Sequence, residues 1–217
     1  MNDNTNNMKL DCLLIQFAKF PRLGGVKTRL KPLLQDDGCF QLHLELMSCV
    51  NENLKASGIF QILSIDQLGQ HDTINQLAGH TPILLQQGDD LGERMQHALA
   101  WGLQRAKKVI IVGSDCPVLN AEHLQIVRNK LDEHDHVFIP AEDGGYVLIA
   151  STECFSPIFH GIPWGCDQVL KQTRDKLLKG GKNVGYLPPL WDVDRPEDYK
   201  RLLTVFPDWP IVGIKAG

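Results

Sequence analysis

Short apolar runs alternate along the chain with longer segments in which apolar residues recur every three or four positions. The short runs are typical of buried strands, and the longer segments are typical of helices that present one apolar face to a core. We therefore predict strands at 12–18, 59–65, 82–85, 109–112, 137–139, 146–149 and 184–187. We predict helices at 39–54, 74–78, 91–107, 121–131, 168–178 and 196–205.

The alternation of strands and helices predicts an α/β fold, a three-layer α/β/α sandwich around a mostly parallel but mixed sheet. The run VIIV at 109–112 is apolar at every position, which is typical of a central strand covered on both faces. We expect residues 11–217 to form a single domain. Residues 1–10 are polar and rich in asparagine, and we expect them to form a disordered tail.

Composition narrows the classes of function. The 217 residues are 43% hydrophobic and 22% charged, with a formal net charge of -4. An acidic balance is not typical of a nucleic-acid-binding protein, and the apolar runs are shorter than the roughly 20 residues of a membrane span. The six cysteines form no CxxC pair and no signal-peptide pattern is present, so we expect reduced thiols in a cytoplasmic protein.

Charged or glycine-rich segments follow several of the predicted strands. They are KFPRLGGVKTRL at 19–30, GSDCP at 113–117, EDGGY at 142–146 and WDVDRPED at 191–198. Ligands of open α/β sheets bind beyond the carboxyl ends of the strands, where such segments meet. The sequence therefore predicts one ligand site at this edge of the sheet.

The first of these segments suits an anion. Gly24 and Gly25 let the backbone approach a ligand and leave its amide groups exposed, and Lys27 and Arg29 suit phosphate oxygens. The alternative is a solvated basic loop in which the glycines only make a turn. Neither GxxxxGK[ST] nor GxGxxG is present, so the segment matches no common phosphate-binding fingerprint.

Carboxylates in two other segments suit a divalent cation. Asp115 follows the predicted central strand and could bind Mg²⁺ together with phosphate oxygens, or else cap the following turn. Asp194 could supply a second carboxylate, or else cap the last helix. Asp192 alternates with Asp194 along an extended segment, so at most one of the two is expected to face Asp115 without a bend, and Asp192 is the less favoured.

The remaining motifs are compatible with binding and with a purely structural role. Asp143 in EDGGY suits a hairpin turn that presents its carboxylate to an acceptor hydroxyl. The helix start QGDDLGERM has Asp89 or Asp90 as a cap and also suits a nucleotide. Trp164, between two predicted loops, is the aromatic residue that we place near the site, and the HDH motif at 134–136 is predicted to be a surface loop.

These motifs together resemble a known family. FAKFPRLGGVKTRL, DLGERM, VGSDCPVL, DGGYVLIA, GIPW and DVDRPED occur in this order between residues 13 and 200. They resemble a bacterial family of small transferases with the glycosyltransferase-A (nucleotide-diphospho-sugar transferase) fold, found beside radical-SAM proteins and called glycosyltransferases in arsenosugar-type pathways. The chain is also similar, more distantly, to phospholactate guanylyltransferases and other nucleotidyltransferases, which share the AK-P-G-KTRL opening.

The resemblance implies a nucleotide-binding sandwich with Mg²⁺ or Mn²⁺ held by Asp115, with Asp194 as the second ligand. The chain departs from the D-x-D pattern of such enzymes, because Gly113 stands where the first acid would be. Asp115 and Asp143 are the expected catalytic residues. The expected nucleotide- and phosphate-binding residues are Ala18, Lys19, Gly25, Lys27, Arg29, Gly88, Gly92 and Arg94, and the expected acceptor-binding residues are Gly144, Gly145 and Trp164.

The sequence thus predicts a nucleotide-dependent transferase acting on a small-molecule acceptor, without nucleic-acid or membrane partners. Glycosyl transfer from a nucleotide sugar is favoured by the resemblance. Nucleotidyl transfer from an NTP to a phosphorylated or hydroxyl acceptor remains an alternative, as does a non-catalytic nucleotide-binding protein. The substitution Lys27→Ala is expected to weaken nucleotide binding and to leave thermal stability nearly unchanged.

Overall fold

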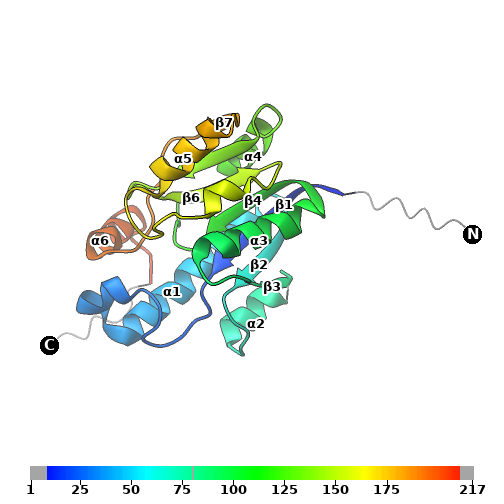
Figure 1. Ribbon diagram of the computed structural model, residues 1–217. Coiled ribbons are helices and arrows are strands. Elements are labelled where there is room, and N and C mark those ends of the chain that lie inside the picture. Colours follow the sequence, from blue (N-terminus) through cyan, green and yellow to red (C-terminus); the bar gives the residue numbers. More distant parts are fainter. Residues whose placement is uncertain (1–8, 80, 211–217) are drawn as a thin grey trace, which may run out of the picture.

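The structure is a computed structural model that describes residues 9–79 and 81–210. A seven-stranded sheet crosses it in the order β3-β2-β1-β4-β6-β5-β7 (Figure 1). The strands are β1 (Leu10–Ala18), β2 (Phe60–Ile65), β3 (Ile83–Leu85), β4 (Ala106–Gly113), β5 (His136–Pro140), β6 (Tyr146–Ser151) and β7 (Val184–Tyr186).

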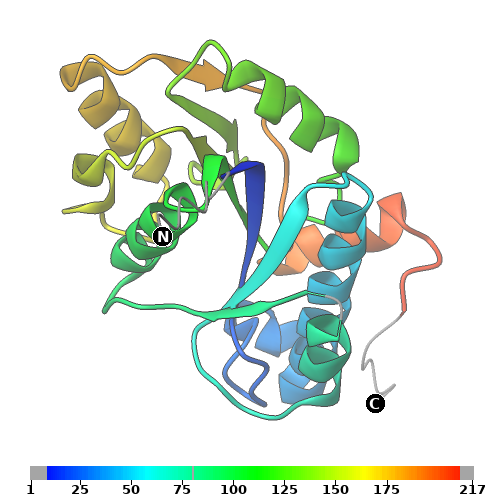
Figure 2. The ribbon, with the colours of Figure 1, turned by 90° about the vertical axis from the view of Figure 1, so that its right-hand side faces the viewer.

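Helices cover both faces of this sheet. They are α1 (Lys31–Lys55), α2 (Asp72–Ala78), α3 (Leu91–Leu103), α4 (Ala121–Lys130), α5 (Val169–Lys179) and α6 (Pro196–Val205), with short 3-10 helices at Thr28–Leu30 and Ser156–Phe159. Apolar residues of α3 and α5 pack on one face of the sheet, and those of α1, α2 and α4 pack on the other (Figure 2). Helix α6 packs against α1. The predicted three-layer sandwich is therefore confirmed.

The direction of the strands brings their carboxyl ends together. Strands β1, β2, β3 and β4 are mutually parallel, β6 runs antiparallel between β4 and β5, and β7 is parallel to β5. The sheet is thus mostly parallel and mixed, as the sequence predicts. The chain leaves β1 toward β2, on the side away from β4, so the ends of β1 and β4 form a topological switch point, where such sheets bind ligands.

The boundary between α3 and β4 differs from the prediction. The amphipathic pattern predicts a helix to residue 107, but α3 ends at Leu103 and β4 begins at Ala106. Ala106 and Lys108 pair with β1, so strand pairing replaces the last helical turn. The Lys108 ammonium therefore does not lie at the end of α3; it forms an ion pair with Asp132 at 2.6 Å and donates a hydrogen bond to the carbonyl oxygen of Arg128 in the last turn of α4.

Other boundaries also differ. Helix α1 begins at Lys31 rather than at residue 39, and it is kinked at Gln35, where φ is 56°. The predicted tail at 1–10 is wrong at Leu10, which starts β1 and pairs with Ala106; residues 1–8 lie outside the described residues. His136 was predicted to lie in a surface loop, but it belongs to β5 and is buried.

Two general expectations can be compared with the structure. All six cysteines carry free thiols. Among the helices of the described residues, none combines the length and the apolar character that crossing a membrane requires.

Candidate functional site

A cavity of about 470 Å³ opens at the switch point between β1 and β4. We call it the polar cavity, because charged and hydrogen-bonding side chains from several distant segments line it. These side chains are Lys19, Lys27, His43, Gln86, Arg94, Ser114, Asp115 and Asp194. Three of the four loops predicted to share one edge of the sheet therefore meet there, namely those at 19–30, 113–117 and 191–198.

Lys27 is the best-fixed cation of this cavity. Its side chain is only 4% exposed, and its Nζ lies 2.6 Å from Asp115 Oδ1. Nζ also donates a hydrogen bond of 2.6 Å to the carbonyl oxygen of Val193. Lys27 thus ties the loop after β1 to the loop after β4 and to the segment before α6, and it points a positive charge into the cavity.

Asp115 carries the opposing charge. Its side chain is 43% exposed, so one partner in the ion pair is buried and the other faces the cavity. Burial acts to raise the pKa of Asp115, but Lys27 and His43 outweigh it and lower the pKa below its ordinary value. The carboxylate is therefore ionised near neutral pH and available to a cation or to a donor group of a ligand. The predicted alternative, a cap on the next turn, is not among the hydrogen bonds of the described residues.

Asp194 lines the same cavity and forms an ion pair with Arg29. It does not cap α6, because Arg195 holds the cap position and the Asp198 carboxylate accepts hydrogen bonds from the backbone amides of Asp194 and Arg195. The helix-cap alternative for Asp194 is therefore wrong. Arg29 is held by Asp194 outside the lining of the cavity.

Asp192 differs from Asp194 in its surroundings. Burial and the nearby charges of Asp115 and Asp143 raise the pKa of Asp192 to about 7. In the part of the chain that the structure describes, its carboxylate has no ion pair and no hydrogen bond. Of these two aspartates, Asp194 is the one that the described residues place in the lining of the polar cavity with Asp115, which is compatible with the expectation that at most one would face it.

His43 and Gln86 were missed by the sequence reading. Helix α1 places His43 beside the loop after β1, with Nε2 2.9 Å from the carbonyl oxygen of Lys19. Burial lowers the pKa of His43, although Asp115 acts to raise it. Gln86 Nε2 donates to the carbonyl oxygens of Ala18 and Ser64 at 3.3 and 3.0 Å. Neither residue lies in a recognisable motif, and only tertiary contacts reveal them.

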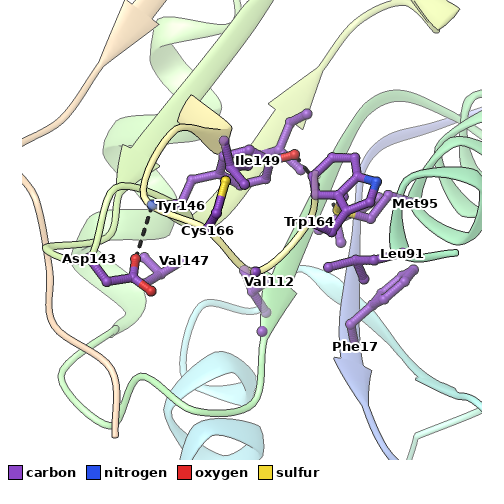
Figure 3. Close-up of a pocket in the computed structure, with 15 residues that line it drawn as sticks. Phe17, Leu91, Met95, Val112, Asp143, Tyr146, Val147, Ile149, Trp164 and Cys166 are labelled. Carbon is purple, nitrogen blue, oxygen red and sulfur yellow. Dashed lines mark hydrogen bonds between the residues drawn. The ribbon is translucent and has the colours of Figure 1, made fainter. Parts of the chain in front are cut away.

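A second cavity of about 180 Å³ lies beside the first and is lined mainly by apolar side chains (Figure 3). We call it the apolar cavity. The EDGG turn between β5 and β6 supplies Asp143, whose Oδ1 accepts a 2.9 Å hydrogen bond from the Gly145 amide. The two cavities are contiguous, because the same residues line both: Phe17, Leu91, Gly113, Trp164 and Gly165.

Some of the predicted site residues line one of the two cavities, and others lie outside both linings. Ala18, Lys19, Lys27, Arg94, Asp115 and Asp194 line the polar cavity, Asp143 and Gly145 line the apolar cavity, and Trp164 lines both. Gly25, Arg29, Gly88, Gly92 and Gly144 line neither. The amide of Gly25 is not free for an anion, since it donates to the carbonyl oxygen of Arg22 at 2.9 Å. The carbonyl oxygen of Gly88 accepts a hydrogen bond from Arg94 Nε at 3.0 Å, which fixes that arginine.

Two of these glycines have a clear packing role instead. A Cβ on Gly92 would lie 2.2 Å from the carbonyl oxygen of Phe159 and 2.6 Å from the Trp164 ring. A Cβ on Gly144, where φ is 92°, would lie 2.2 Å from the carbonyl oxygen of Asp167. Both positions therefore require glycine because backbone segments approach closely there.

The carboxylates suit a divalent cation only in part. Within residues 9–79 and 81–210, no three histidine, cysteine, aspartate or glutamate side chains gather as a ready-made metal site. Mg²⁺ in nucleotide enzymes needs only one or two carboxylates, because phosphate oxygens and water complete its shell. Asp115 and Asp194, which both line the polar cavity, fit that description.

Comparisons with known proteins agree with this picture. The chain is 28% identical over 135 residues to a 2-phospho-L-lactate guanylyltransferase of Methanobrevibacter smithii, an alignment that covers 61% of this chain and 57% of that relative. It is 21% identical to the enzyme of the same name from Methanobrevibacter ruminantium, with 84% and 81% of the two chains covered. This chain thus spans little more than half the length of the first of these relatives.

A solved structure from Desulfovibrio desulfuricans G20, described as a nucleotide-diphospho-sugar transferase, superposes with a TM-score of 0.82 at 29% identity and covers 93% of this chain and 90% of its own. The neighbours therefore share the nucleotide-diphospho-sugar transferase fold, and their names support the prediction of an enzyme of the transferase class. Residues 49–166 match the family DUF2064, described as an uncharacterized protein conserved in bacteria. The chain belongs to the DUF2064 family.

Proposed function

We propose that the protein is a nucleotidyltransferase that transfers a nucleoside monophosphate from an NTP to a small-molecule acceptor and releases pyrophosphate. The observation that carries this proposal is the Lys27–Asp115 pair, which sets a buried ammonium and an ionised carboxylate at the mouth of the β1–β4 switch point. Lys19 and Arg94 line the same cavity. Together these cations suit the several negative charges of a triphosphate. The names of the guanylyltransferase relatives support the same reading.

The chemistry follows from these positions. An acceptor oxygen attacks the α-phosphorus, the new bond is O–P, and the bond to the pyrophosphate oxygen breaks. Lys27, Lys19 and Arg94 stabilise the negative charge that the phosphates carry and that grows on the leaving pyrophosphate. Asp143, at the adjoining apolar cavity, takes the proton of the acceptor hydroxyl.

A divalent cation fits this scheme. Asp115 would hold it, with Asp194 as a second carboxylate, and the bound cation would neutralise phosphate charge and orient the phosphates. Before a cation binds, Lys27 keeps Asp115 ionised, because the adjacent ammonium lowers the pKa of that carboxyl against the effect of burial. The single acid of the GSD motif would then be sufficient, because Asp194, in the segment before α6, would supply the second carboxylate that Gly113 cannot.

Glycosyl transfer is a second candidate, favoured by the similarity to the D. desulfuricans protein described as a nucleotide-diphospho-sugar transferase. In that reaction the bond between the sugar and the β-phosphate breaks, and a nucleoside diphosphate leaves. The same polar cavity would bind a diphosphate donor, so the two reactions differ in the leaving group rather than in the cations that stabilise it.

Identification of the released product separates the two reactions. The protein is incubated with Mg²⁺ or Mn²⁺, a small-molecule extract as a source of acceptors, and either the four NTPs or a set of UDP-, GDP- and ADP-sugars. We expect pyrophosphate to be released from one NTP and to be lost in the Asp115→Ala variant. Release of a nucleoside diphosphate from a sugar donor, without pyrophosphate from any NTP, would establish glycosyl transfer instead.

A further inference from the structure

The apolar cavity differs in charge from the cavity beside it. Among the described residues that line it, there is no lysine, arginine or histidine, and Asp143 is the one acid. Aromatic and aliphatic side chains make up most of the rest, including Phe17, Met95, Tyr146 and Trp164 (Figure 3). A ligand group in this cavity therefore meets apolar surface and, at one end, a carboxylate.

The position of the cavity relates it to the reaction proposed above. Figure 3 shows Asp143 at one end of the cavity and Phe17 with Leu91 at the other, with Val112 of β4 between them. Phe17 and Leu91 also line the polar cavity, as does Gly113. A ligand group bound in the apolar cavity would therefore lie next to a nucleotide bound in the polar cavity, because the two cavities are contiguous at these shared residues.

The charge of the lining excludes one class of acceptor. A phosphate or carboxylate placed here would leave water without gaining a cation, and it would face the like charge of Asp143. Both curated relatives are named for 2-phospho-L-lactate, which carries a phosphate and a carboxylate. The lining of the apolar cavity does not suit groups of that charge.

We propose that the apolar cavity is the acceptor subsite and that it takes a compact, mainly apolar group whose hydroxyl or amino function is not anionic, in place of a phosphorylated acid. This proposal rests on the transferase function proposed above. Asp143 accepts the hydrogen bond of that hydroxyl or amino group, since its Oδ1 is already engaged by the Gly145 amide and the second oxygen remains. The volume suits one six-membered ring, because an apolar protein cavity of about 150 Å³ binds benzene.

A matched series of one-ring probes tests the charge preference without requiring turnover. The probes are benzyl alcohol, benzylamine, benzoate and phenyl phosphate, and binding is followed by ligand-observed NMR. We expect the alcohol and the amine to bind with roughly millimolar affinity, as small fragments do, and both anions to bind at least about tenfold more weakly. Equal or tighter binding of phenyl phosphate, or no binding of any probe, would overturn the proposal.

Two variants place the binding in this cavity. Cys166→Trp fills the cavity from a half-buried loop position and is expected to abolish binding of benzyl alcohol. Cys154→Trp is the matched control, because Cys154 is exposed and lies outside the lining. Asp143→Asn conserves volume and should lower the affinity for benzylamine at least about fivefold more than that for benzyl alcohol. Unchanged binding in Cys166→Trp, or an unchanged amine-to-alcohol ratio in Asp143→Asn, would contradict the assignment.

The nucleobase is the competing occupant. If GTP or another NTP displaces benzyl alcohol competitively, the cavity is a base pocket and the proposal is wrong. The outcome is distinguishable from failure of the proposed function, which depends on product release rather than on probe binding. Pyrophosphate release with a phosphorylated acid as acceptor would refute the subsite and leave the function standing. Absence of any nucleotide turnover would refute the function and leave the probe series interpretable.

Discussion

The polar and the apolar cavity lie side by side at one edge of the same sheet and share part of their lining. Different interactions fix the residues that line each of them. The polar cavity depends on contacts between distant segments, such as the bond from Lys27 Nζ to the carbonyl oxygen of Val193, 166 positions away. The apolar cavity is shaped by packing around α3, Trp164 and the EDGG turn. Substitutions on the polar side should therefore change charge and tertiary structure together, whereas substitutions on the apolar side should act mainly through volume.

The largest effect is expected for Asp115→Asn, which keeps the shape of the side chain and removes its charge. The transfer rate should fall by about 10²–10³, which is typical for the loss of one electrostatic contact in an active site. The matched control is Asp36→Asn, because Asp36 is also paired with a lysine, Lys31 at 2.8 Å, but on the exposed surface. Equal rates for Asp115→Asn and the wild type, measured as released product, would remove Asp115 from the site.

The next prediction concerns Lys27, which is expected to contribute both to NTP binding and to the stability of the fold. Lys27→Ala should weaken NTP binding at least about tenfold, a loss of one charge-assisted contact. It should also lower the free energy of unfolding by about 1–3 kcal/mol, because the Val193 carbonyl and Asp115 lose a partner. The expectation from sequence, that stability stays nearly unchanged, is thus revised because the side chain is buried.

Lys31→Ala provides the control for this variant. Its pair with Asp36 is exposed, so its loss should change the free energy of unfolding by less than about 1 kcal/mol. Denaturant titration and NTP titration on the same samples give both quantities. If Lys27→Ala unfolds more easily while its affinity per folded molecule is intact, the loop after β1 is only structural.

Near the apolar cavity, Gly92→Ala should lower the free energy of unfolding, whereas Gly113→Ala should leave it nearly unchanged. An added Cβ at Gly92 meets the Phe159 carbonyl and the Trp164 ring, and this overpacking should cost about 1–3 kcal/mol of unfolding free energy. An added Cβ at Gly113 meets nothing within 4 Å, so stability should change by less than about 0.5 kcal/mol. Because Gly113 lines both cavities, its methyl group should still weaken ligand binding. Similar melting curves for the two variants would contradict the observed packing.

The remaining prediction concerns the pH dependence of stability. The pKa of Asp192, raised to about 7 from an ordinary value of 3.8, means that the folded state binds more protons than the unfolded state between these values. The stability that protonated Asp192 contributes is therefore fully present below about pH 4 and is lost as pH rises through about 7. Asp192→Asn should flatten this decline, while the exposed control Asp37→Asn should not. Unfolding curves at pH 5 and pH 8 that give the same difference for wild type and Asp192→Asn would show that Asp192 is not desolvated.

The sequence was a good guide to the elements whose local pattern and tertiary role agree. Helix α6 begins at Pro196 and ends at Val205 as predicted, since proline at its first turn and one apolar face act together. The apolar run at 109–112 lies in the centre of the sheet as β4. The end of α3 was misplaced because the helical pattern continues into residues that pair with β1 instead. There the long-range strand contact outweighed the local propensity.

At the candidate site, the sequence located the charged loops but not their partners. Lys27 and Asp115 were predicted from their positions after strands, and both line the polar cavity. His43 was missed because it lies in the middle of α1, where nothing in the local pattern separates it from a core residue. Gly92 was assigned to nucleotide binding because a glycine at a helix start suits phosphate. Its actual constraint, contact with Phe159 and Trp164, arises from residues far away in the chain.

The central claim is that the protein binds an NTP in the polar cavity and transfers its nucleoside monophosphate, with the α-phosphate, to an acceptor. The most direct test is to supply an NTP labelled at the α-phosphate, together with Mg²⁺ and a small-molecule extract, and to follow the label. We predict that the label moves to an acceptor in amounts equal to the released pyrophosphate, and that Asp115→Asn slows both by about 10²–10³. Label that stays entirely in the nucleotide, with a sugar transferred and a nucleoside diphosphate released from a nucleotide-sugar donor, would contradict the claim.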